Sequence, residues 1–198
     1  MKKIVVITGS PRKKGNSFAM AEAFIQTAEA KGHTVTRFDA AHMSIGGCAA
    51  CEACYKTENA CIHNDDFNII APAIIGADVL VFTMPLYWFS FPGQIKNVLD
   101  KFYSFLVGQK REAFGKKYAL ITCAEMNDLS VFDSLRNQFK QSVAFLRGEV
   151  INMITIPNVH RIRDIDNDLP PLLSPIPMLV NPLSCNKAEY TIVSVLPC

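Results

Sequence analysis

The sequence of 198 residues has no long hydrophobic run. No uninterrupted apolar stretch approaches the ~20 residues that a membrane-spanning helix needs. The apolar run near the start covers only Ile4 to Ile7, and Arg12, Lys13 and Lys14 follow soon after it, so it lacks the form of a secretory signal. These absences predict a protein that is neither embedded in a membrane nor secreted.

Net charge is also small, because 20 Lys and Arg residues face 18 Asp and Glu residues. A nearly neutral surface gives no general attraction to nucleic acids or to anionic membranes. We therefore expect neither as a partner. The length fits a single domain that can bury most of its apolar surface around one core.

The cysteines do not form the pattern of an extracellular disulfide framework. Their number is odd, at seven, and four of them lie close together between Cys48 and Cys61. In a chain without a secretory signal, this usage indicates thiols kept in a reducing compartment. We expect a cytoplasmic protein.

Strand-like and helix-like segments alternate along the chain. Apolar runs rich in β-branched residues predict five strands, at 4–8, 34–39, 78–83, 118–123 and 150–156. Apolar residues at helical spacing predict helices between them, at 18–28, 67–74, 95–102 and 132–146. The strands are continuously apolar rather than alternating, which is typical of a parallel sheet buried by helices on both faces. The predicted fold class is therefore α/β.

The end of the chain differs in composition from the rest. Six of the eleven prolines lie at or after Pro170, and no helical period extends from 169 to 182. We expect a domain at 1–160 and an irregular, proline-rich tail at 161–198. A helix that would normally return to cover the sheet is then missing. One face must be covered by the tail, by a second subunit, or incompletely.

The segment from Thr8 to Ser17 joins the first predicted strand to the first predicted helix. Ligands of parallel sheets bind beyond the carboxyl ends of the strands, where the start of a helix presents backbone N–H groups to an anion. Ser10, Asn16 and Ser17 add hydroxyl and amide donors, and Arg12 adds a cation. We expect Asn16 or Ser17 to cap the helix. The segment predicts an anion site, against the alternative of an ordinary polar loop.

Two common nucleotide-binding motifs are absent from this segment. A Walker loop closes with Gly-Lys followed by Ser or Thr, whereas Gly15 is followed by Asn16. A dinucleotide loop requires a second glycine two positions after the first, whereas Ser10 and Pro11 follow Gly9. The sequence therefore disfavours both an ATPase and a Rossmann dehydrogenase.

A second loop of interest follows the third predicted strand. It carries four aromatic residues within five positions, including the only tryptophan of the chain: Tyr87, Trp88, Phe89 and Phe91. Aromatic side chains can stack against a planar ring. The alternative is a hydrophobic lid or a subunit interface without a ligand. Together the two loops indicate a ligand-binding site more specifically than either loop does alone.

These features resemble the flavodoxin-like NAD(P)H-dependent FMN reductases, including the iron-sulfur flavoproteins. The resemblance covers about residues 1–157 and rests on Gly9 to Arg12, Gly15 to Ser17, Pro85 to Trp88, the pair Asp65 and Asp66, and Lys96 with Asp100. It implies a doubly wound five-stranded parallel sheet in the order 2-1-3-4-5. It also implies a homodimer or higher oligomer.

The resemblance further implies which residues bind the cofactor. The FMN phosphate would be held by Ser10, Arg12, Asn16 and Ser17. The flavin ring would contact, on one side, Pro85, Leu86, Tyr87, Trp88 and Phe89. The loop on its other side would contribute Thr122, Cys123, Ala124 and Glu125. Electrons would pass from NAD(P)H through FMN to a small acceptor such as a quinone, nitro or azo compound, in a ping-pong cycle that needs no catalytic side chain.

A compact group of four cysteines lies between the second predicted strand and the second predicted helix: Cys48, Cys51, Cys54 and Cys61. Gly46 and Gly47 precede them and permit a tight backbone. The spacing can wrap a [4Fe–4S] cluster, as the cysteines of bacterial ferredoxins do. Zinc, a redox pair of two of the thiols, and packed thiols without a ligand are the alternatives.

The cysteine group sets up an alternative function. With a cluster, the protein would be an electron carrier that exchanges electrons with a ferredoxin-like partner. A third reading is a binding module that kept the fold and lost the flavin. His63 is interpreted as a solvated loop histidine and Cys123 as a small buried hydrophobic residue. No catalytic histidine is assigned.

Overall fold

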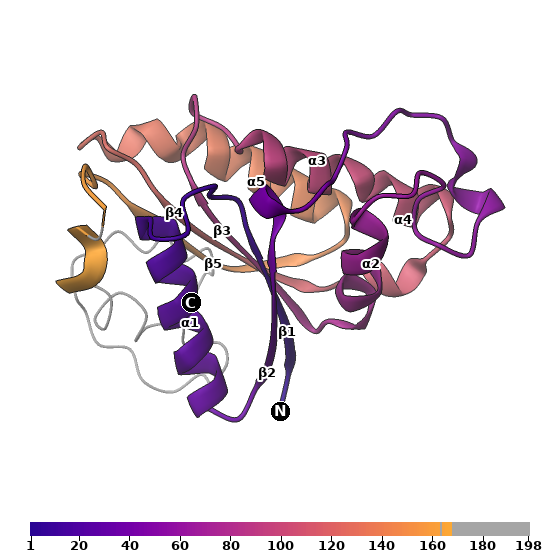
Figure 1. The fold of residues 1–198 in the computed structure, drawn as a ribbon, viewed down its shortest axis with the longest axis horizontal. Helices are drawn as coiled ribbons and strands as arrows, with labels where there is room; N and C mark the ends of the chain where they lie inside the picture. The colour runs from indigo at the N-terminus through magenta and orange to yellow at the C-terminus, as the bar shows by residue number, and fades with distance from the viewer. Residues whose placement is uncertain (163, 168–198) are drawn as a thin grey trace.

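The computed structural model of the chain describes residues 1–162 and 164–167 (Figure 1). Its strands are β1 (Lys3–Thr8), β2 (Thr34–Asp39), β3 (Val79–Pro85), β4 (Lys117–Cys123) and β5 (Glu149–Ile156). Its α-helices are α1 (Asn16–Ala30), α2 (Phe67–Gly76), α3 (Gly93–Lys101), α4 (Tyr103–Val107) and α5 (Asp133–Phe145). Short 3-10 turns lie at Ala40–His42, Ala53–Lys56, Arg111–Ala113, Leu129–Phe132 and Asp164–Asn167. Among the described helices, none has the length and apolar character to span a bilayer.

The five strands form one parallel sheet in the order β2-β1-β3-β4-β5. This confirms the predicted fold class and strand order. The register pairs Thr8 with both Asp39 and Thr83, and Cys123 with both Pro85 and Ile156. The carboxyl ends of the strands therefore meet at one edge of the sheet, where the following loops lie close to one another.

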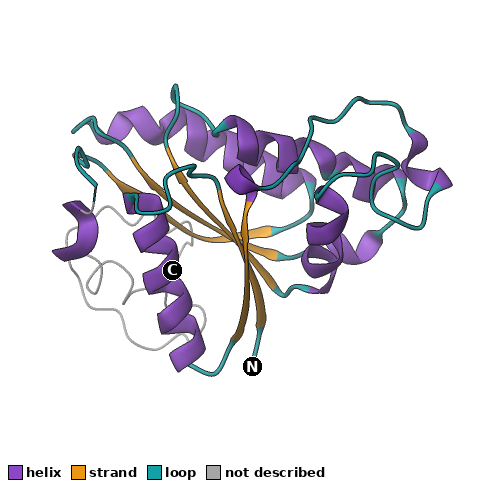
Figure 2. Ribbon diagram, in the orientation of Figure 1, coloured by secondary structure: helices purple, strands orange, loops and turns teal. Residues whose placement is uncertain are grey.

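Side chains of each strand alternate between two cores, one on each face of the sheet. Val5 and Ile7 of β1 point toward α2, α3 and α5, together with Leu80 and Phe82 of β3. The neighbouring positions of β1 point to the other face and pack against α1. Figure 2 shows helices on both faces of the sheet, as the continuous apolar strands predict.

The α1 face carries no second α-helix within the described residues. The 3-10 turn Asp164–Asn167 packs beside α1 instead, and Ile165 is buried in the same core as Met20 and Phe24. Apart from residues 161, 162 and 164–167, the predicted tail at 161–198 lies outside the described residues. The domain boundary at 160 stays a prediction.

Candidate functional site

The loop between β1 and α1 ends at a helix that has no side-chain cap. Gly15 occupies the cap position and the helix begins at Asn16, so the prediction that Asn16 or Ser17 caps it is wrong. The reason is a turn in which the Gly15 N–H donates to the Arg12 carbonyl at 2.9 Å, which places Gly15 directly before the helix. Among the described residues, the backbone N–H groups of Asn16 and Ser17 meet no acceptor. Such N–H groups at a helix start are suited to bind an anion.

The same loop is tightly folded. A side chain at Gly15 would place its Cβ 3.1 Å from the Arg12 carbonyl oxygen and 3.6 Å from Ser10 Oγ. The Ser10 hydroxyl accepts the Arg12 N–H at 3.2 Å. Ser10 and Ser17 are buried while Arg12 is exposed. The loop therefore combines buried hydroxyl donors with a cation at its rim.

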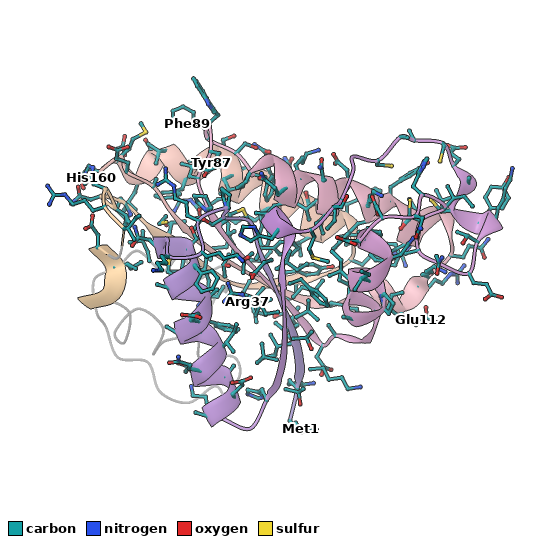
Figure 3. The ribbon with its side chains drawn as sticks, viewed as in Figure 1. Met1, Arg37, Tyr87, Phe89, Glu112 and His160 are labelled. Atoms are coloured by element: carbon teal, nitrogen blue, oxygen red, sulfur yellow. The ribbon has the colours of Figure 1, made fainter. Side chains whose placement is uncertain are left out.

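The loop that carries Tyr87, Trp88, Phe89 and Phe91, here called the aromatic loop, contains a tight hairpin turn. Tyr87 and Ser90 exchange backbone hydrogen bonds at 3.2 and 2.9 Å, and the two residues between them, Trp88 and Phe89, have φ angles of +47° and +61°. Two central residues with positive φ are typical of a type I′ turn, which strongly prefers asparagine and glycine. Bulky side chains are strained there. Trp88 is 95% exposed, and Figure 3 shows Tyr87 and Phe89 on the loop that protrudes from the edge of the sheet.

We expect the double substitution Trp88→Asn with Phe89→Gly to raise the free energy of unfolding by roughly 1–3 kcal/mol, because it relieves the backbone strain of the turn. Urea denaturation measures this change. Alanine at both positions is the matched control, since it removes the rings and keeps the positive φ angles. A gain of equal size in the alanine variant would contradict the strain argument.

The loop after β4 is tied to both of its neighbours. The Leu86 N–H donates to the Cys123 carbonyl at 2.8 Å, and the Ala124 N–H donates to the Ile156 carbonyl at 3.0 Å. Burial raises the pKa of the Cys123 thiol to about 11, so this thiol is neutral near neutral pH. This agrees with its interpretation as a buried hydrophobic residue.

Two adjoining cavities lie between these loops, with volumes of about 250 and 590 Å³. They share five lining residues: Arg12, Leu86, Tyr87, Ala124 and Glu125. All the residues predicted to bind flavin line one cavity or the other, except Thr122, which is buried within β4. The structure thus gathers the predicted residues of three separate loops around one connected space.

One wall of the smaller cavity was missed by the sequence analysis. It is formed after β5 by Val159, His160, Arg161 and Ile162. The Val159 N–H donates to the Ala124 carbonyl at 3.0 Å, and His160 Nδ1 lies 3.3 Å from Glu125 Oε1. The signal was available, because the carboxyl end of every strand in a parallel sheet faces the same edge. The motifs that carry the family resemblance end before this wall, and Arg161 and Ile162 fall in the predicted tail at 161–198.

The cysteine loop, residues 46–64, lies at the far end of α3 from the aromatic loop (Figure 1). Cys48 and Cys51 are exposed, whereas Cys54 and Cys61 are buried. Burial, followed by the nearby thiols of Cys61, Cys51 and Cys48, raises the pKa of Cys54. The other three thiols therefore lie close enough to Cys54 to disfavour its thiolate.

The donor set of this loop fits an iron-sulfur cluster in its chemistry, because four thiols within fourteen residues are the ligands such clusters take. Across residues 1–162 and 164–167, however, no three His, Cys, Asp or Glu side chains are arranged to hold a metal ion. Exposed His63 lies with Nε2 3.6 Å from Cys51 Sγ, so it contacts a thiol as well as solvent.

Both ends of the cysteine loop are anchored by a buried ion pair. Lys101 Nζ lies 2.5 Å from Asp65 Oδ2 and also donates to Cys61 Sγ at 3.7 Å. Asp65 accepts the N–H groups of Gly46 and Phe67 as well, at 2.9 and 3.1 Å. Burial raises the pKa of Asp65, but the hydrogen bonds from Lys101, Gly46 and Phe67 outweigh it and hold the pKa below its usual 3.8.

Comparison with known proteins identifies a family that the chain matches over most of its length. Residues 2–160 match the family described as NADPH-dependent FMN reductase. The chain is 34% identical over 99 residues to an iron-sulfur flavoprotein of Methanocaldococcus jannaschii, covering 50% of each protein. It is 30% identical over 115 residues to an iron-sulfur flavoprotein of Methanosarcina thermophila, covering 58% of this chain and 59% of that protein. The chain spans about half the length of the curated relatives it matches.

Solved structures share the fold at low sequence identity. An NAD(P)H:quinone oxidoreductase from Methanothermobacter marburgensis superposes with a TM-score of 0.72 at 17% identity, over 93% of this chain and 99% of that one. An NADH:FMN oxidoreductase superposes with a TM-score of 0.62 at 15% identity, over 91% of each chain. At these identities the likeness concerns the arrangement of the sheet and its helices.

Proposed function

Because the chain belongs to the NADPH-dependent FMN reductase family, we propose that it binds FMN and passes electrons from NAD(P)H through the flavin to a small acceptor. The observation that carries the proposal is the pair of adjoining cavities at the carboxyl edge of the sheet. Three loops line them: the segment from Thr8 to Ser17, here called the phosphate loop, the aromatic loop, and the loop after β4. Arg12, Leu86 and Ala124 line both cavities. Ligands of doubly wound sheets bind at this edge.

Each loop has a distinct part in the proposed site. The phosphate would rest against the N–H groups at the start of α1, the hydroxyls of Ser10 and Ser17, and the Arg12 guanidinium. Leu86, Tyr87 and Ala124 would position the ring and exclude water from it. FMN itself supplies the hydride chemistry when bound, so the protein's contribution is binding and orientation.

The larger cavity supports a planar acceptor. Tyr87, Trp88 and Phe89 line it, and aromatic side chains suit a planar molecule stacked above the flavin. A structural neighbour is named an NAD(P)H:quinone oxidoreductase, which supports a quinone acceptor. Nitro and azo compounds have the same planar character. The choice among them stays part of the proposal.

We expect Arg12→Met to weaken FMN binding about tenfold, because it removes a charge-assisted contact with the phosphate. The dissociation constant is measured by quenching of flavin fluorescence on flavin-free protein. Lys13→Met is the matched control, since Lys13 lies in the same loop, is exposed and lines neither cavity. Equal effects of the two substitutions would count against Arg12 as a phosphate ligand.

The activity itself is tested with FMN-loaded protein under anaerobic conditions. We expect NADPH or NADH to bleach the flavin absorbance and an added quinone to restore it. A protein that binds FMN but is bleached only by dithionite would overturn the reductase proposal.

A second candidate function is an electron carrier with a [4Fe–4S] cluster at Cys48, Cys51, Cys54 and Cys61. It is supported by the spacing of these cysteines and by the matched relatives that are named iron-sulfur flavoproteins. Iron, sulfide and zinc analysis after anaerobic purification distinguishes a cluster from zinc and from unligated thiols. A ferredoxin-like partner, a homodimer and a cytoplasmic location stay predictions.

A further inference from the structure

The cavity wall after β5 extends beyond the part of the chain that matches the family. The match ends at residue 160, yet Arg161 and Ile162 line the smaller cavity together with the phosphate loop. Arg161 and Arg12 are the arginines of this cavity, and they come from opposite ends of the domain sequence. Figure 3 shows the neighbouring His160 on a loop at the same end of the molecule as Tyr87.

Asn16 connects this wall to the phosphate loop. Its Nδ2 donates to the Arg161 carbonyl at 2.7 Å, and its Oδ1 accepts the Ile165 N–H at 3.5 Å. Both polar atoms of the Asn16 side chain are therefore engaged by residues 145 and 149 positions away in sequence. They hold the wall in place against the start of α1.

Two further contacts hold the wall in place. Asp164 Oδ2 accepts the backbone N–H groups of His160 and Arg161 at 2.9 and 2.6 Å. Ile165 is 1% exposed and packs in the core beneath α1. The backbone of Arg161 is thus fixed from both sides, so that ligand binding by its side chain requires little further ordering of the backbone.

We propose that Arg161 is a second cation for the FMN phosphate, and that Asn16 is a positioning residue that holds Arg161 there. The inference rests on the proposed flavin site. A phosphate monoester carries about two negative charges near neutral pH, so two arginines match its charge. The acidic group of the same cavity, Glu125, has a side chain that is 78% exposed, and its Oε1 lies 3.3 Å from His160 Nδ1.

The first experiment compares FMN with riboflavin, which lacks the phosphate, on flavin-free full-length protein. Arg161→Met should weaken FMN binding about tenfold and leave riboflavin binding unchanged. Arg111→Met is the control, because Arg111 is exposed and lies at the opposite edge of the sheet, before β4. Unchanged FMN binding in Arg161→Met overturns the proposal. An equal loss of FMN and riboflavin binding overturns it as well, because it would show that Arg161 only packs in the cavity wall and does not bind the phosphate.

The second experiment tests the role of Asn16 by a double-mutant cycle. Asn16→Ala should produce the same loss of FMN binding as Arg161→Met, and the double variant should lose little more than either, because both substitutions remove one contact. Additive losses would make Asn16 an independent ligand and overturn its positioning role. A wild-type protein that binds neither FMN nor riboflavin overturns the flavin site itself. This outcome differs from a failure of the Arg161 proposal and from a failure of the positioning role of Asn16.

Discussion

Replacing Lys101 with methionine should lower the free energy of unfolding by about 3–5 kcal/mol. The Lys101 side chain is 2% exposed and that of Asp65 is 16% exposed, so the substitution leaves a buried carboxylate without its cation. It also removes the donor to Cys61 Sγ and loosens both ends of the cysteine loop. Urea denaturation followed by circular dichroism measures the change.

The same helix provides a matched control. Lys96 pairs with Asp100 at 2.5 Å, as Lys101 does with Asp65, but the side chains are 52% and 44% exposed. Lys96→Met should therefore change stability by only about 0.3–0.5 kcal/mol. Adding Asp65→Asn to Lys101→Met should recover part of the loss, because the unpaired charge is then gone. Equal effects at Lys96 and Lys101 would contradict the importance of burial.

The pH dependence of the free energy of unfolding should also reflect the ion pair of Lys101 and Asp65. Because the folded-state pKa of Asp65 lies below its usual 3.8, its stabilisation is present above that value and is lost as the pH falls through the folded pKa. The Lys101→Met variant should show a smaller loss of stability on acidification, since the largest hydrogen bond that lowers this pKa is gone.

Gly9→Ala should destabilise the fold by roughly 1–3 kcal/mol and weaken FMN binding at the proposed site. A Cβ at Gly9 would lie 2.4 Å from Ile95 Cγ1 of α3 and 3.3 Å from Met84 Cβ. The Gly9 N–H donates to the Thr83 carbonyl at 2.9 Å, so the loop cannot move away without losing this bond. Any shift displaces the phosphate loop that follows.

Gly93→Ala is the control for this substitution, because an added Cβ at Gly93, the first residue of α3, meets nothing within 4 Å. It should leave stability unchanged or raise it by about 0.4–1 kcal/mol through a stiffer unfolded chain. Urea denaturation and FMN titration are measured on both variants. Full FMN affinity in Gly9→Ala would show that α3 yields to the new methyl group.

Local sequence patterns were sufficient to predict the strands and most of the helices. Consecutive residues of a strand point to opposite faces of the sheet, so the uninterrupted apolar run from Ile4 to Ile7 requires both faces to be buried. This requirement can be read from the sequence because it involves adjacent residues. The second predicted helix agrees with α2 in the same way, through the spacing of its apolar residues. The predicted helix at 95–102 corresponds to α3, but α4 directly after it was not anticipated.

The sequence by itself therefore determined the α/β alternation, the edge of the sheet at which the proposed site lies and the loops that would form it, since each depends on neighbours in the chain. Only the tertiary structure decided that Lys101 is buried, that Trp88 and Phe89 adopt positive φ, and that Asn16 holds a wall after β5. Each of these depends on contacts between distant residues, such as the 145 positions between Asn16 and Arg161. Periodicity and spacing carry no signal of such contacts, because they arise from the packing of whole elements.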